Sequence, residues 1–191
     1  EREGTYVLMH ALDPEEFWTV ADPEMVKRGW FYGDGTYPTS EGLYAQIDNV
    51  LEKYPRLNLC LAHFFFCSQK PEKLAKMLDK YENLAVDITP GGEMYIGFNK
   101  NPEYYKSFFE KYQDRVIFGT DMDFTPHLEA GVWLCDRVYR FLATDEVISS
   151  FDDHMIKGIK LDTEAVQKIT SDNLLNKLGR KPKEINKDAL R

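Results

Sequence analysis

Two histidines and one aspartate stand where apolar stretches of the chain stop. His10 follows one apolar run, His63 follows a second and Asp121 follows a third. Imidazole nitrogens and a carboxylate oxygen suit zinc or a similar divalent ion. If the runs are parallel strands of one sheet, their carboxyl ends share one edge, and the three side chains meet in a common pocket. A single histidine at a strand end is more often structural, so the prediction rests on all three residues together.

The apolar runs that would position these residues alternate with helical patterns. The expected strands span residues 6–9, 57–62, 84–89 and 115–120. Their nearly continuous apolar character is typical of parallel strands covered on both faces. Apolar stripes at helical spacing predict helices at 43–54, 74–81, 105–112 and 132–142, with a short final helix at 174–178. Strand followed by helix, repeated, predicts an α/β fold of about four parallel strands with right-handed crossovers.

Two expected loops are unusually long. One spans residues 11–39 and is rich in tryptophan, tyrosine and phenylalanine, and the other spans residues 90–102. Both follow strands and would lie at the carboxyl ends of the sheet, where α/β proteins bind ligands. Long loops in a compact domain are usually functional or disordered, and the aromatic content argues against disorder. Two roles stay open, a ligand site and a cover for one end of the core.

Composition narrows the class of protein. With 191 residues the chain suits one domain, and its 24 basic and 32 acidic residues give a net charge of −8, which argues against a nucleic-acid partner. No apolar run approaches the length of a membrane span, and no secretory leader is visible. Cys60, Cys67 and Cys135 form neither a disulfide framework nor a zinc motif, so we expect buried, reduced thiols and a cytoplasmic location.

Three segments resemble signature strands of a known enzyme superfamily. They are residues 6–11 (YVLMHA), 59–63 (LCLAH) and 115–121 (RVIFGTD). Together they resemble the amidohydrolase superfamily, most closely the amidohydrolase-2 branch of metal-dependent hydrolases and decarboxylases. The helix at 44–55 and the segment 169–175 (ITSDNLL) are similar to that branch as well.

The resemblance implies a (β/α)8 barrel of which only part is present. Members of the family begin with a His-any-His pair on their first strand, and this chain has no such pair. By the resemblance, His10, His63, Thr89 and Asp121 end strands five to eight. A full barrel of this type needs about 250 residues. We therefore expect the C-terminal half of a barrel over residues 1–179, followed by a charged tail at 180–191.

The resemblance also implies a role for each candidate. His10 is similar to a metal ligand, Asp121 to a ligand that also accepts the proton of the attacking water, and His63 to a second-metal ligand or a residue that polarises the substrate. The implied cofactor is one zinc ion or two, with the ligand set incomplete in this chain. The implied substrate is a small organic molecule, and hydrolysis and decarboxylation both stay open. One departure is Phe64-Phe65-Phe66, where the family often has glycine shortly after this histidine.

Other polar residues are weaker candidates. Asp87 interrupts an apolar run and is more easily explained as a buried, hydrogen-bonded carboxylate than as a pocket residue. Asp123 and His127 fall in an expected loop, and His154 is expected on the surface. The pair Asp172-Asn173 is expected to cap a helix or to organise structural hydrogen bonds.

Four parallel strands cannot close a barrel. They leave open edges and an uncovered apolar face, which favour pairing with a missing N-terminal half or with a second copy of the chain. We expect these residues alone to bind metal weakly or not at all and to lack activity. The alternative function is a non-catalytic half-barrel that serves as an interaction or oligomerisation module. An unrelated open α/β sheet would instead leave His10, His63 and Asp121 scattered.

Overall fold

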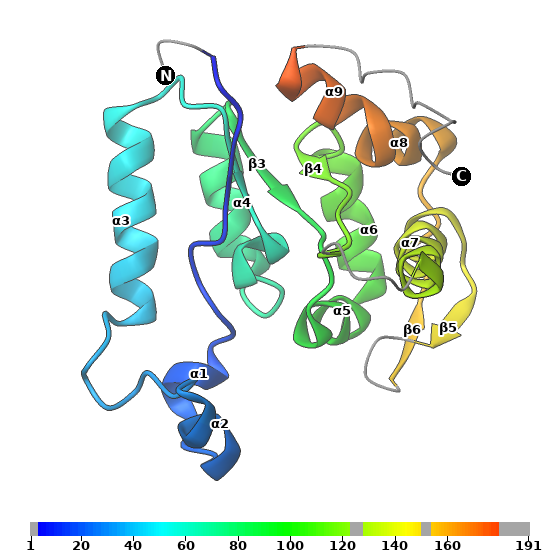
Figure 1. The fold of residues 1–191 in the computed structure, drawn as a ribbon. Helices are drawn as coiled ribbons and strands as arrows, with labels where there is room; N and C mark the ends of the chain where they lie inside the picture. Colours follow the sequence, from blue (N-terminus) through cyan, green and yellow to red (C-terminus); the bar gives the residue numbers. More distant parts are fainter. Residues whose placement is uncertain (1–3, 123–127, 150–153, 180–191) are drawn as a thin grey trace.

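The computed structural model describes residues 4–122, 128–149 and 154–179 (Figure 1). Its main sheet contains β1 (Val7–Met9), β2 (Leu59–Leu61), β3 (Leu84–Asp87) and β4 (Val116–Ile117). These strands pair in parallel in the order β1-β2-β3-β4. The predicted α/β fold with four parallel strands is confirmed. Because neighbouring strands are in register, their carboxyl ends lie along one edge of the sheet.

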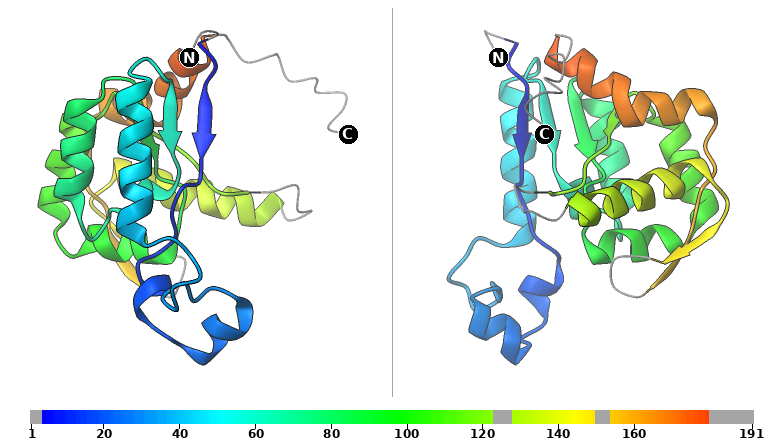
Figure 2. Two further views of the ribbon diagram at one scale, coloured as in Figure 1. Left: turned by 90° about the vertical axis from the view of Figure 1, so that its left-hand side faces the viewer. Right: turned by 45° about the vertical axis from the view of Figure 1, so that its right-hand side comes forward.

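Three long helices connect the strands and pack on one face of the sheet. They are α3 (Ser40–Lys53), α4 (Pro71–Lys80) and α6 (Pro102–Lys111), and Figure 2 shows them on the same side of the strands. Each was predicted from its apolar stripe. Alternate strand residues face them, among them Leu59, Leu61 and Val86, and all are buried. The main core therefore lies between the helices and this face.

The opposite face of the sheet is much more sparsely covered. Tyr6, Cys60, Ala85 and Ile117 form a small separate cluster there. Leu8, on the same face of β1, is 57% exposed. Within the described residues no strand lies beyond β1, so the sheet is open at that edge. This is the uncovered face expected of an incomplete barrel.

The C-terminal segments cover the other edge of the sheet. They are α7 (Leu128–Ala143), α8 (Thr163–Gln167), a π-helical turn η2 (Lys168–Asp172) and α9 (Asn173–Leu178). The amide of Phe118, just after β4, donates to the carbonyl of Ile169 at 2.9 Å. Gly179 ends α9 in the left-handed conformation expected for a glycine C-cap. The sequence predicted α7 and α9 but not α8.

Some sequence expectations were wrong. The expected loop at 90–102 contains α5 (Gly92–Asn99), whose Met94, Tyr95 and Phe98 are buried, so this segment covers the core. Two glycines in its eight residues concealed a helix that packing stabilises. An antiparallel hairpin, β5 (Val147–Ser149) with β6 (Met155–Lys157), was not expected either. Both strands are only three residues long, too short for a clear pattern.

The cysteine and helix-stripe predictions hold only in part. Cys60 and Cys67 are buried, and burial raises the pKa of their thiols to about 12 and about 11. Cys135 is exposed, which corrects the expectation that all three are buried. It lies on α7 beside Val132, which is 63% exposed, so only part of that predicted stripe faces the core. The charged segment 180–191 lies outside the described residues, and none of the described helices is long and apolar enough to span a bilayer.

Candidate active site

His63 is fixed by hydrogen bonds on both its backbone and its ring. It lies two residues after the end of the buried strand β2 and is itself buried. Its amide donates to Asp87 Oδ1 at 2.8 Å, and its ring Nδ1 lies 3.2 Å from the carbonyl oxygen of Thr89. Because a carbonyl only accepts, this contact places the hydrogen on Nδ1 and leaves the lone pair on Nε2. A metal-binding histidine uses this tautomer when Nε2 is the ligand atom.

The backbone at His63 turns left-handed for four consecutive residues. His63, Phe64, Phe65 and Phe66, which form η1, have φ values of 54°, 54°, 53° and 50°. This conformation costs roughly 1–2 kcal/mol per non-glycine residue. The three phenylalanines that stand where the family often has glycine therefore adopt the positive φ that glycine favours. Such strain is typical of functional sites and persists only where the surroundings hold it.

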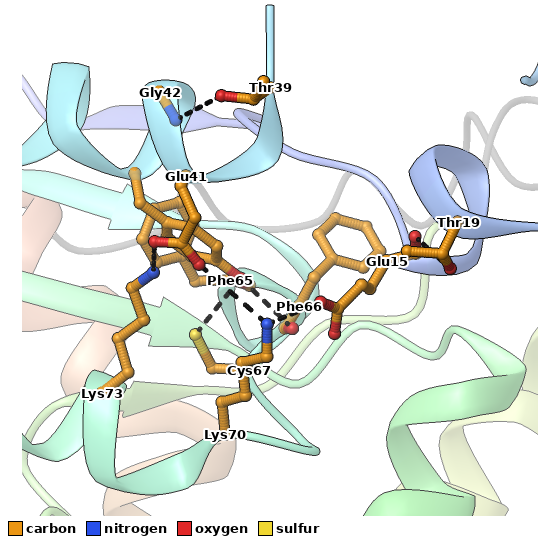
Figure 3. Close-up of polar contacts among 11 residues, drawn as sticks. Glu15, Thr19, Thr39, Glu41, Gly42, Phe65, Phe66, Cys67, Lys70 and Lys73 are labelled. Carbon is orange, nitrogen blue, oxygen red and sulfur yellow. Dashed lines mark hydrogen bonds and ion pairs between the residues drawn. The ribbon is translucent and has the colours of Figure 1, made fainter. Parts of the chain in front are cut away.

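Packing and hydrogen bonds hold this turn in place. Phe64 and Phe65 are fully buried, which pays for the backbone strain with apolar contacts. The hydroxyl of Tyr44 on α3 lies 3.4 Å from the carbonyl oxygen of Phe65, and the thiol of Cys67 donates to that hydroxyl at 3.6 Å (Figure 3). Lys73 lies 3.4 Å from the centre of the Tyr44 ring. The strained turn is thus braced by the core helices.

Asp87 positions the strand ends of β2 and β3. One oxygen, Oδ1, accepts from the amides of His63 at 2.8 Å and Thr89 at 3.0 Å. Burial raises the pKa of this carboxyl group, while the two backbone hydrogen bonds act in the opposite direction. The expectation of a buried, hydrogen-bonded carboxylate is confirmed. The side chain also forms part of the wall of the cavity described below.

His10 is held far more loosely. It follows β1 at the open edge of the sheet, and its side chain is 51% exposed. Its Nε2 lies 3.2 Å from Asp13 Oδ1. The centroids of the His10 and His63 rings are 4.9 Å apart in an edge-on arrangement, and Phe66 contacts both rings at 5.4 and 5.2 Å. Two imidazoles from different strands therefore lie side by side.

Asp121 lies in the same cavity as the two histidines. It follows β4, has a left-handed φ of 55° and is exposed. The cavity measures about 530 Å³ and is lined by His10, His63, Asp87 and Asp121 along with neighbouring residues of the four strands. His10, His63 and Asp121 therefore line one cavity at the carboxyl ends of the strands.

The donor atoms do not yet form a complete metal cage. Among the described residues, no group of three or more histidine, cysteine, aspartate or glutamate side chains is arranged to hold a metal ion. The Nε2 atom of His10 faces Asp13 rather than a shared centre. The types of donor fit a divalent ion, since they are two imidazoles and a carboxylate. These three donors are fewer than the four ligands usual for zinc.

A comparison with protein families decides the assignment. The family model Amidohydro_2, described as amidohydrolase, matches residues 1–173. The chain belongs to the amidohydrolase family. The resemblance seen in the three signature segments is confirmed, and enzymes of this family generally use divalent metals.

A solved structure of another protein is similar to this amidohydrolase chain. It is an uncharacterized TIM-barrel protein from Bordetella bronchiseptica, 17% identical, with a TM-score of 0.47. The match covers 94% of this chain and 48% of that one, so the amidohydrolase chain spans about half the length of this neighbour. Among curated proteins none matches.

The weaker candidates take structural roles or cannot be placed. Asp123 and His127 lie outside the described residues, and His154 is exposed. Asn173 is buried and donates to the carbonyls of Gln113 and Val116 at 2.6 and 2.7 Å, which confirms the structural hydrogen bonds expected there. Asp172 does not cap α9 with its side chain.

Sequence reasoning gave no role to two residues that contact the histidines of this amidohydrolase chain. Asp13 contacts His10, and the carbonyl of Thr89 orients the ring of His63. The spacing of three residues between His10 and Asp13 is a signal that was available in the sequence. The Thr89 contact is made by a backbone oxygen, which no sequence pattern reveals.

Proposed function

We propose that this chain supplies half of the active site of a metal-dependent hydrolase that acts on a small organic substrate. The observation that carries the proposal is the pair of imidazoles, His10 and His63, 4.9 Å apart in a cavity that Asp121 also lines. Membership of the amidohydrolase family supports a hydrolytic reaction.

Each residue has a distinct proposed role. His63 offers the lone pair of Nε2, because its Nδ1 hydrogen is held by the carbonyl of Thr89. His10 is the second nitrogen ligand. To bind the ion, its Nε2 atom must lose its present contact with Asp13. Asp121 is a carboxylate ligand and accepts a proton from the attacking water. Asp87 is a positioning residue, since it acts through the backbone of His63.

The proposed cofactor is zinc, as one ion or two. When bound, such an ion makes hydroxide available at neutral pH by lowering the pKa of a bound water to about 7. Decarboxylation would use the same residues, with proton delivery to a carbon atom in place of attack by water. Release of carbon dioxide from the substrate distinguishes that reaction from hydrolysis.

The remaining ligands are proposed to come from a second half-barrel. Leu8 on the open face of β1 is exposed, and an apolar groove between β4 and α7 is lined by Phe118, Met122 and Val132. Burying these surfaces against the missing N-terminal half, or against a second copy, would close the sheet. The same exposed apolar surfaces also favour the alternative, a non-catalytic half-barrel that acts as an association module. Buried, unpaired Cys60 and Cys67 support a reducing compartment, and we propose a cytoplasmic location.

The reading frame that precedes Glu1 separates the enzyme from the alternative. The enzyme proposal expects a His-any-His pair at the end of a strand there, and an upstream barrel sequence without this pair favours the association module. In the protein encoded by the whole frame, His63→Ala and Asp121→Asn are each expected to lower kcat/KM at least about a hundredfold. His154→Ala, at an exposed histidine, is the matched control. Equal activity of all four proteins would refute the proposed roles.

A further inference from the structure

A second, smaller cavity adjoins His10. It measures about 250 Å³, and its walls include His10, Asp13, Trp18, Tyr32 and Tyr37. His10 lines both this cavity and the larger one that contains His63 and Asp121. Most of these residues come from the segment between β1 and α3, which contains α1 (Glu16–Thr19) and α2 (Pro23–Arg28) and lies beyond the carboxyl end of β1 (Figures 1 and 2).

The aromatic walls are in contact with one another but are not buried. The ring centroids of Trp18 and Tyr32 are 5.1 Å apart, and those of Tyr32 and Tyr37 are 4.7 Å apart. Tyr37 is nevertheless 49% exposed, and Trp18 and Tyr32 are partly exposed. Rings that served only as a small core would be expected to exclude water from their faces. These rings instead leave apolar faces available to a ligand.

Contacts within the chain hold the segment that carries the rings in shape. Trp18 Nε1 donates to the carbonyl of Pro38 at 2.9 Å. A side chain on Gly33 would collide with its surroundings, because a Cβ atom there would lie 2.3 Å from the carbonyl oxygen of Trp18. Lys70 lies 2.7 Å from Glu15, which ties the segment to the residues after η1 (Figure 3). The cavity is therefore largely pre-formed, as ligand pockets usually are.

The polar groups of the cavity define what it would accept. Asp13 contributes a carboxylate, and the described residues that line the cavity include His10 but no lysine or arginine. Burial, followed by the nearby charge of Asp13, raises the pKa of the Tyr32 hydroxyl, so this hydroxyl stays protonated. A ligand with a hydroxyl or amino hydrogen can donate to Asp13. A ligand with its own carboxylate would be repelled by it.

We infer that this cavity binds a neutral aromatic ring bearing a hydroxyl or amino group, as the ring portion of the substrate. A cavity of roughly 150 Å³ holds benzene, so about 250 Å³ suits one substituted six-membered ring. A ring bound in this cavity lies beside His10, which also lines the larger cavity. Its role as part of the substrate rests on the proposed function, whereas binding of the ring does not require a metal.

The test measures binding of phenol and of benzoate to the metal-free chain by saturation-transfer NMR in the presence of a chelator. Phenol is expected to bind with a Kd on the order of 1 mM, as its few atoms allow. Benzoate is expected to bind at least tenfold more weakly because it meets the carboxylate of Asp13. Equal binding of the two probes, or no binding of phenol, would overturn the inference.

Three variants locate the binding. Tyr37→Ala, at an exposed ring, is expected to weaken phenol binding at least tenfold, and Trp30→Ala, at an exposed ring outside the cavity, is expected to leave it unchanged. Asp13→Asn is expected to bring benzoate binding close to that of phenol. Equal binding by Tyr37→Ala and the unmodified chain would place phenol elsewhere and refute the site. Because this test contains no metal, a failure of phenol to bind selectively would not refute the proposed function. A failure of the chain to bind zinc would not refute the proposed ring-binding cavity.

Discussion

The two histidines of the site are held in opposite ways. His63 is buried at the centre of the sheet, where its amide and ring both have hydrogen-bond partners and a strained turn is packed beneath it. His10 lies on the open edge strand with half of its side chain exposed and one contact, to Asp13. The more deeply buried histidine is therefore the one that is more firmly held in place. The centre of the sheet fixes its histidine through contacts within this chain, while the histidine at the edge has a single exposed contact.

Removing the packing beneath His63 is expected to have the largest effect. Phe64→Ala should lower the free energy of unfolding by about 3–5 kcal/mol, because it empties a fully buried site. Leu8→Ala, on the exposed face of β1, should change it by less than about 0.5 kcal/mol. Urea denaturation of both variants measures the difference. Equal losses would show that the edge is as well packed as the centre.

The hydrogen bonds of Asp87 come next in expected size. Asp87→Ala leaves the amides of His63 and Thr89 without their acceptor and should cost about 2–4 kcal/mol. Asp13→Ala, which removes the exposed partner of His10, should cost at most about 1 kcal/mol. Asp87→Asn keeps a carbonyl oxygen and should recover part of the loss. Equal decreases in the denaturation midpoint for Asp87→Ala and Asp13→Ala would contradict the difference between the two histidines.

A pH scan of stability adds a smaller effect at the other end of the sheet. Burial, with repulsion from Arg115 as a lesser cause, lowers the pKa of the Lys177 amine to about 8. Between pH 8 and the ordinary pKa of a lysine amine, the unfolded chain binds more protons than the folded chain. The free energy of unfolding should therefore rise with pH in this range. The gain should be about 1 kcal/mol, discounted because the amine is partly exposed to solvent. Lys177→Met should remove the rise, and a rise of equal size in this variant would assign it to another group.

The sequence predicted the parts of this molecule that depend on local pattern. The strands, the long helices and the meeting of His10, His63 and Asp121 follow from apolar runs and from the geometry of parallel strands. The helix at Gly92–Asn99 was missed because glycines mask a segment that packing holds in shape. The left-handed turn at His63 was also hidden, since three phenylalanines give no local signal for a positive φ. Contacts through backbone oxygens, such as that of Thr89, appear only in three dimensions.

Titration of the chain with zinc by calorimetry near neutral pH addresses the site itself. We expect one weak site, weakened at least tenfold by His63→Ala, less strongly by the loosely held His10→Ala, and unchanged by His154→Ala. Binding that is indifferent to both His10 and His63 would contradict a shared metal site. Tight stoichiometric binding would contradict the proposal that this chain holds only part of the ligand set.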